Sequence, residues 1–168
     1  MGALTLVCLL LTVFPFATYA LPAMASVFLV PVVIECGPKW ATAVYAAEAL
    51  LALLITPDVE AKLLFVAFFG YYPIIKSLTE RIKMRTLEWG AKFLVFNVAV
   101  VGAYLLLSFV GFSMDAFRFD GVSWPLWSFL LAFWLAGNVV FLLYDITLTR
   151  LIPLYFSHLQ PMFRRLFR

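Results

Sequence analysis

The sequence predicts an all-α fold, a polytopic membrane helix bundle of about six transmembrane helices. Of its 168 residues, 65% are hydrophobic, 18% are aromatic and only 12% are charged, and the mean hydropathy is +1.05. The first charged side chain is Glu35. A helix over residues 1–34 would be ~50 Å long, whereas the hydrocarbon core of a bilayer is ~30 Å thick. This stretch is therefore too long for one span and too apolar for a soluble core.

The same composition argues against a separate water-soluble domain. Such a domain carries about 25% charged residues, roughly twice the fraction found here. We therefore expect residues 1–149 to form the transmembrane bundle, and the basic, aromatic residues 150–168 to form an interfacial tail on anionic lipid. A cleaved signal peptide is the alternative for the N-terminus, but its basic n-region is missing, so we favour a retained first span.

Two prolines divide the opening apolar stretch. Pro15 and Pro22 would each remove a backbone hydrogen bond from a helix that ran through them. We therefore expect a short first span at 2–15 and a second span at 21–35. The connection between them is apolar, and it must be buried against protein or line a cavity because lipid cannot satisfy its backbone.

Turn residues also bound the third and fourth spans. The third is expected at 40–55, because Gly37-Pro38 precedes it and Thr56-Pro57 follows it. The fourth is expected at 61–75 and contains a break at Gly70–Pro73.

Charge and polarity bound the last two spans. The strongly charged segment Lys76–Lys92 is expected to form a solvated helical extension. The fifth span is expected at 93–112. A polar loop at 113–123 then leads to the sixth span at 124–148.

The distribution of lysine and arginine predicts the orientation. With six spans and a cytoplasmic Lys76–Lys92 segment, ten of the twelve basic residues lie on the cytoplasmic side. These are Lys39, Lys76, Arg81, Lys83, Arg85, Lys92, Arg150, Arg164, Arg165 and Arg168, against Lys62 and Arg118 outside. We therefore predict a multi-pass protein of the plasma membrane with both termini in the cytoplasm. A five-span chain would instead have its N-terminus outside.

Glu48 is the most informative single residue, because it lies near the middle of the third span. An ionised carboxylate is costly at that depth, and an acid within a membrane is a functional-site hypothesis by default. We expect it to face the bundle interior, with Asn138 and Tyr104 as its nearest partners. The alternative is a protonated or hydrogen-bonded glutamate that holds two helices together.

The sixth span carries a polar and aromatic stripe. Its members lie within about 80° of one helical face at ~100° per residue. They are Trp127, Leu131, Trp134, Asn138, Phe141 and Asp145. Two tryptophan faces above the Asn138 amide would form a site for a flat, partly polar ligand, whose candidate residues are Glu48, Tyr104, Trp127, Trp134 and Asn138. The alternative is ordinary bundle packing, with Trp127 in the interfacial aromatic belt.

Several chemical motifs are missing from the sequence. It has no glycine-rich phosphate loop, no HExxH, no GxSxG and no cluster of paired carboxylates. We therefore expect no enzyme activity, no cofactor and no metal site. The basic residues flank apolar stretches, which favours a membrane surface over nucleic acid. Cys8 and Cys36 have no CxxC or histidine-rich context, so we expect no disulfide framework.

The small size, the span count and the apolar connection after a short first helix resemble the substrate-binding (S) components of energy-coupling-factor (ECF) transporters. The stretch from Leu21-Pro22-Ala23 through Ile34–Trp40 is also similar. The resemblance implies a six-helix bundle that captures a vitamin-like small molecule or a metal ion from outside. It further implies a bacterial plasma membrane and partners, namely a transmembrane coupling subunit and ATPase subunits. The alternative is a non-catalytic scaffold of a cell-envelope complex, similar to the rod-shape membrane proteins.

Overall fold

The computed structural model describes residues 2–13, 18–109 and 126–159. Every regular element in these ranges is a helix, which confirms the predicted all-α class. In chain order they are α1 (Gly2–Leu10), the 3-10 helix η1 (Leu11–Val13), α2 (Ala20–Val27), α3 (Leu29–Cys36), α4 (Pro38–Ile55), α5 (Val59–Leu64), the π-helix η3 (Phe65–Phe69), α6 (Tyr72–Thr79), α7 (Arg85–Phe109), α8 (Leu126–Leu154) and the π-helix η5 (Tyr155–Leu159).

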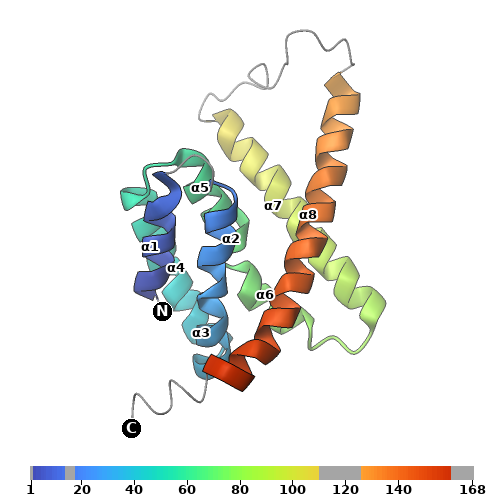
Figure 1. Ribbon diagram of the computed structural model, residues 1–168. Helices are drawn as coiled ribbons and strands as arrows, with labels where there is room; N and C mark the ends of the chain where they lie inside the picture. Colours follow the sequence, from blue (N-terminus) through green and yellow to red (C-terminus); the bar gives the residue numbers. More distant parts are fainter. Residues whose placement is uncertain (1, 14–17, 110–125, 160–168) are drawn as a thin grey trace.

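The chain passes up and down the molecule in alternating directions, with α2–α3 forming one pass and α5–η3–α6 forming another (Figure 1). Helix α1 begins at the same end of the molecule at which α8 ends. Within the described ranges, four helical segments are long and apolar enough to cross a membrane. They are Pro38–Ile55, Val59–Thr79, Arg85–Leu105 and Leu130–Ser157. The apolar segment Ala20–Cys36 is shorter, and α1 with its nine residues is shorter still. These four segments are consistent with the predicted helical membrane bundle.

Proline and glycine set the boundaries in the first half of the chain, as expected. Gly37 has a φ of 84°, in the region that favours glycine, and Pro38 occupies the first turn of α4. The second predicted span is divided into α2 and α3 at Phe28. Pro31 explains this division, because it has no N–H for the carbonyl of Val27 and its ring crowds that carbonyl.

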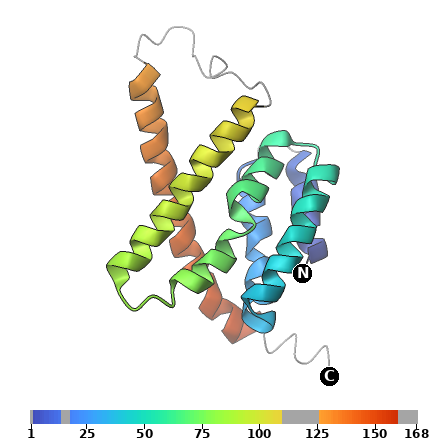
Figure 2. The same ribbon diagram turned by 180° about the vertical axis from the view of Figure 1, so that it is seen from behind.

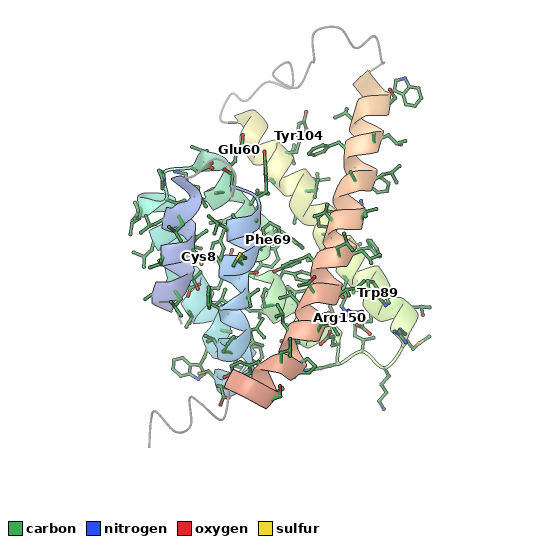
Figure 3. The ribbon with its side chains drawn as sticks, in the orientation of Figure 1. Cys8, Glu60, Phe69, Trp89, Tyr104 and Arg150 are labelled. Atoms are coloured by element: carbon green, nitrogen blue, oxygen red, sulfur yellow. The ribbon has the colours of Figure 1, made fainter. Side chains whose placement is uncertain are left out.

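The upper end of the α1–α6 region is held by polar contacts at the ends of the helices. The Asp58 carboxylate caps α5 by accepting hydrogen bonds from the backbone N–H groups of Glu60, at 2.9 Å, and Ala61, at 3.3 Å. The Tyr19 hydroxyl donates to the Glu60 carboxylate at 2.9 Å, and this bond raises the pKa of Tyr19. Glu60 is labelled near this end in Figure 3.

The charged segment differs from the prediction. Helix α6 continues to Thr79, and α7 already begins at Arg85, eight residues before the predicted start of the fifth span at residue 93. The expectation of a solvated segment is wrong for Lys76 and Lys92, each of which is only 2% exposed. In the connection between the helices Arg81 and Lys83 are exposed, as expected, but residues 80–84 are not helical.

The last helix is also longer than expected. It passes the predicted end at residue 148 and continues through Arg150 to Leu154. The predicted polar loop at 113–123 lies outside the described residues, as does the tail from residue 160 onward.

Two groups of buried residues form the core. One lies among α1, α2, α3, α4 and η3 and contains Leu9, Ala25, Leu29, Ala52 and Phe65. The other joins α3, η3 and α6 to α7 and α8, and its members are Val30, Phe68, Tyr72, Ala99, Phe141 and Leu148. Aromatic rings dominate the second group: Phe141 stacks on Phe96 with centroids 4.7 Å apart, and Phe68 meets both rings edge-on.

Helices α7 and α8 cross and then diverge, so the upper part of α8 extends away from the rest of the bundle (Figures 1 and 2). Trp127 and Trp134 are accordingly 69% and 47% exposed. The predicted stripe therefore faces the interior only in its lower half, at Phe141 and Asp145, which are buried. For Trp127, Leu131 and Trp134 the prediction is wrong, because α8 has left the bundle at that level.

A π-helical segment interrupts the α5–α6 region where α4 packs on it. The Tyr45 hydroxyl donates to the Val66 carbonyl at 2.7 Å, and the Gly70 N–H donates to the Phe65 carbonyl at 2.7 Å. A Cβ atom on Gly70 would lie 2.6 Å from the Tyr45 ring and 2.9 Å from the Phe65 carbonyl oxygen. Only glycine leaves room for this contact.

We predict that Gly70→Ala lowers the free energy of unfolding by ~1–3 kcal/mol, because the added methyl group must displace Tyr45 or the backbone. The measurement is thermal denaturation of the purified protein in detergent. Gly90→Ala is the matched control, since a Cβ atom there meets nothing within 4 Å. Equal stability of the two variants would show that the close approach of Tyr45 is not required.

Candidate functional site

Asp145 on α8 forms the centre of a buried ionic cluster. Its carboxylate lies 2.6 Å from the Lys76 ammonium of α6 and 3.2 Å from the Lys92 ammonium of α7. The Tyr72 hydroxyl donates to the same carboxylate at 2.7 Å. Asp145 is 2% exposed, like both lysines. One carboxylate thus joins three helices at a single point.

Two further carboxylates complete the cluster on its more exposed side. Glu80 lies 2.8 Å from Lys76 and 3.7 Å from Lys92, and Glu88 lies 2.7 Å from Lys92. The Lys92 ammonium also lies 5.1 Å from the centroid of the Trp89 ring, near the lower end of α7 (Figure 3). Three acids therefore face two cations. Such pairing is required here, because an unpaired buried charge costs several kcal/mol.

Helical spacing produces this arrangement locally. Tyr72, Lys76 and Glu80 follow one another at intervals of four residues, so they share one face of the chain from α6 onward. Glu88 and Lys92 have the same spacing on α7. The sequence analysis missed the cluster, although ionisable residues at intervals of four beside apolar spans were the available signal.

A second polar cluster joins α7 and α8 above the ionic cluster. The Trp134 indole N–H donates to Asn97 Oδ1 at 2.5 Å, and Asn97 Nδ2 donates to Asn138 Oδ1 at 3.3 Å. Each amide also bonds to its own helix, to the carbonyls of Phe93 and Trp134 respectively. Asn97 and Asn138 are half-buried and Trp134 is exposed, so this amide–indole cluster is accessible from one side.

Glu48 occupies a third polar site, in the contact between α1 and α4. It is 3% exposed, which confirms that it faces the interior. Its predicted pairing with Asn138 or Tyr104 is wrong, since neither carboxylate oxygen has a hydrogen-bond partner among the described residues. Asn138 instead bonds within the amide–indole cluster, and Tyr104 is exposed on the upper part of α7 (Figure 3).

The structure thus does not bring the predicted ligand-binding residues together in one site. The structure brings Trp134 and Asn138 together and adds Asn97, which the sequence analysis did not include in the site. Tyr104 and Trp127 lie farther up the diverging helices, and Glu48 lies in a different contact. In the part of the chain that the structure describes, no group of three or more His, Cys, Asp or Glu side chains is placed to hold a metal ion.

Comparisons with known proteins found no relatives. No family model matches the chain, and no curated protein or solved structure matches it significantly. The resemblance to ECF substrate-binding components therefore stays a prediction.

We predict that Asp145→Asn destabilises the protein by ~3–5 kcal/mol, because it leaves two buried ammonium groups without their shared counter-charge. Glu88→Gln should destabilise the protein clearly less, since Lys92 retains Asp145 as its counter-ion. Both are measured by thermal denaturation in detergent.

Replacing the three buried charged residues provides the complementary test. The triple variant Lys76→Met, Lys92→Met and Asp145→Leu should recover most of the stability lost in Asp145→Asn, because well-packed apolar groups replace buried ion pairs at little cost. A triple variant as unstable as the single one would contradict the assignment of the cost to unpaired charge.

Proposed function

We propose that this protein is a non-catalytic membrane subunit that binds a small, flat, partly polar molecule where α7 and α8 diverge. In this proposal it depends on partner subunits for energy, as the substrate-binding components of ECF transporters do. The observation that carries the proposal is the amide–indole cluster of Asn97, Trp134 and Asn138. It places polar groups and an exposed aromatic face at one accessible point on two transmembrane helices.

The hydrogen-bonding capacity of this cluster is only partly used. Asn138 Nδ2 donates one of its two protons, to the Trp134 carbonyl, and Asn138 Oδ1 accepts one bond, from Asn97. A primary amide offers two donors and two acceptor lone pairs. Asn138 therefore retains one donor and one acceptor beyond these bonds, and Trp134 retains a ring face for stacking. A planar heterocycle with adjacent donor and acceptor atoms fits this combination.

The ionic cluster supports such a site from below. Asp145 lies two helical turns from Asn138 on the same face of α8, and Lys92 lies five residues before Asn97 on α7. The Lys92–Asp145 pair and the stack of Phe96 on Phe141 hold the two helices together at this level. The amide groups are thereby positioned before a ligand binds, which reduces the ordering cost of binding.

The proposed topology has six spans, with both termini in the cytoplasm of a bacterial cell. Two observations support it: the alternating direction of the segments (Figure 1) and the excess of basic residues on one side. In this orientation the α6–α7 connection and the ionic cluster lie toward the cytoplasm. The diverging ends of α7 and α8 lie toward the outside, where a substrate-binding component would capture its ligand.

Binding is tested by purifying the protein from native membranes and identifying copurified small molecules and proteins by mass spectrometry. We predict that Trp134→Ala weakens binding of the recovered molecule by ~1–3 kcal/mol, because stacking on the indole ring is lost. Trp40→Ala is the matched control, since Trp40 is an exposed tryptophan on α4. Recovery of cell-wall enzymes with no small molecule would instead favour the scaffold.

Topology is tested by reporter fusions to the full chain. We predict that a reporter at Asp58 lies outside, whereas reporters at Lys83 and Arg168 lie in the cytoplasm, as the basic asymmetry requires. An N-terminal reporter found outside, with the other positions unchanged, would contradict six spans and leave five.

A further inference from the structure

The contact between α1 and α4 contains buried polar atoms without partners. Both carboxylate oxygens of Glu48 and the hydroxyl oxygen of Thr5 are inaccessible, and none of the three has a hydrogen-bond partner among the described residues. Thr5 is fully buried and Glu48 is 3% exposed. Buried polar groups are paired in the great majority of cases, so each exception requires an explanation such as a bound ion.

The backbone of α1 closes over the Glu48 carboxyl group. A Cβ atom on Gly2 would lie 2.9 Å from Glu48 Oε1 and 3.8 Å from its carboxyl carbon. Not even a methyl group fits on this side without displacing the carboxyl group. A hydrated cation is far larger than a methyl group, and cations such as Ca²⁺ take six to eight oxygen ligands. The smallest cation, a proton, fits this geometry best.

No charged side chain of the described residues pairs with Glu48. Helix α1 has no Asp, Glu, Lys, Arg or His. On α4 the other charge is Lys39, more than two turns away. The titratable Cys8 of α1 and Tyr45 of α4 are uncharged near neutral pH. The α-amino group of Met1 lies outside the described residues, and acetylation of the N-terminus tests whether this group pairs with Glu48.

The charged groups on the neighbouring elements have partners elsewhere. On α5, Lys62 donates to the Thr56 carbonyl and Glu60 accepts from Tyr19. On α6, Lys76 is held by Asp145 and Glu80. On α3, Glu35 accepts from Tyr155.

We propose that Glu48 is a proton-binding site within the membrane, where the neutral carboxyl group holds α1 against α4. The proton comes from water and binds one carboxylate oxygen, which then acts as a donor toward the Thr5 hydroxyl. Loss of the proton leaves an unpaired charge in an apolar contact, which is strongly unfavourable. Ionisation of Glu48 therefore favours separation of α1 from α4, and proton binding favours their contact.

The direct test is infrared spectroscopy of the full chain in lipid nanodiscs near neutral pH. The wild type should show the carbonyl stretch of a protonated carboxyl group, and Glu48→Gln should lose it. Thr5→Val should shift this band without abolishing it. Glu60→Gln is the matched control, because Glu60 is exposed and lies outside the contact between α1 and α4, so its replacement should leave the Glu48 band unchanged.

Three results would overturn the proposal. The first is that the wild-type spectrum shows no protonated-carboxyl band, or shows one that is unchanged in Glu48→Gln. The second is a band that appears only after acetylation of the N-terminus, which would mean that the α-amino group pairs with an ionised Glu48. The third is a band that Na⁺ removes at constant pH and ionic strength while K⁺ does not, which would identify a metal cation as the occupant.

Stability gives a second, independent readout. If Glu48 carries a proton in the folded protein at a pH where the unfolded chain has lost it, stability falls as the pH rises. The thermal midpoint of the wild type should therefore decrease from mildly acidic to alkaline pH, and Glu48→Gln should flatten this dependence. Identical pH profiles for the two proteins would contradict a proton at this site.

Discussion

The pairing of the Asp145 carboxylate with the Lys76 and Lys92 ammonium groups determines how the second half of the molecule is arranged. Each lysine comes from a different helix, so the position of α8 is defined relative to both α6 and α7. The aromatic core and the amide–indole cluster lie directly above this point. If the pairing were absent, the few other links between α7 and α8 would have to hold the crossing alone.

Polar groups have this role because apolar packing distinguishes poorly between alternative arrangements of helices within a membrane. Lipid tails are as apolar as leucine, so burying a leucine between two helices gains little over leaving it in lipid. Hydrogen-bonded amides and ion pairs, in contrast, have favourable geometry in one register only. In this chain the two polar clusters of α8 lie two turns apart on one face, with the Phe141 ring between them. They define the rotation of α8 as well as its depth.

Sequence reasoning succeeded where local chemistry decides the outcome. Pro31, Gly37 and Pro38 interrupt helices for steric reasons that do not depend on the rest of the chain. Glu48 faces the interior because a carboxyl group is costly to expose to lipid. It failed for Lys76 and Lys92, whose burial depends on an acid 69 and 53 residues away. It also failed for Trp134, because a face that is buried near Asp145 becomes exposed once α8 diverges from its neighbours. Contacts between distant segments, rather than helix periodicity, decide such positions.

The length of the last helix has a mechanical consequence. With 29 residues, α8 is ~43 Å long, which exceeds the ~30 Å hydrocarbon core of a bilayer. A helix that is too long for its membrane tilts, thickens the surrounding lipid or extends into the headgroups. Because α7 and α8 are joined near their crossing, a change in the tilt of either one alters the opening between their free ends. Bilayer thickness would thus change the width of the proposed ligand site, because a thicker membrane favours an arrangement in which the two helices are closer to parallel.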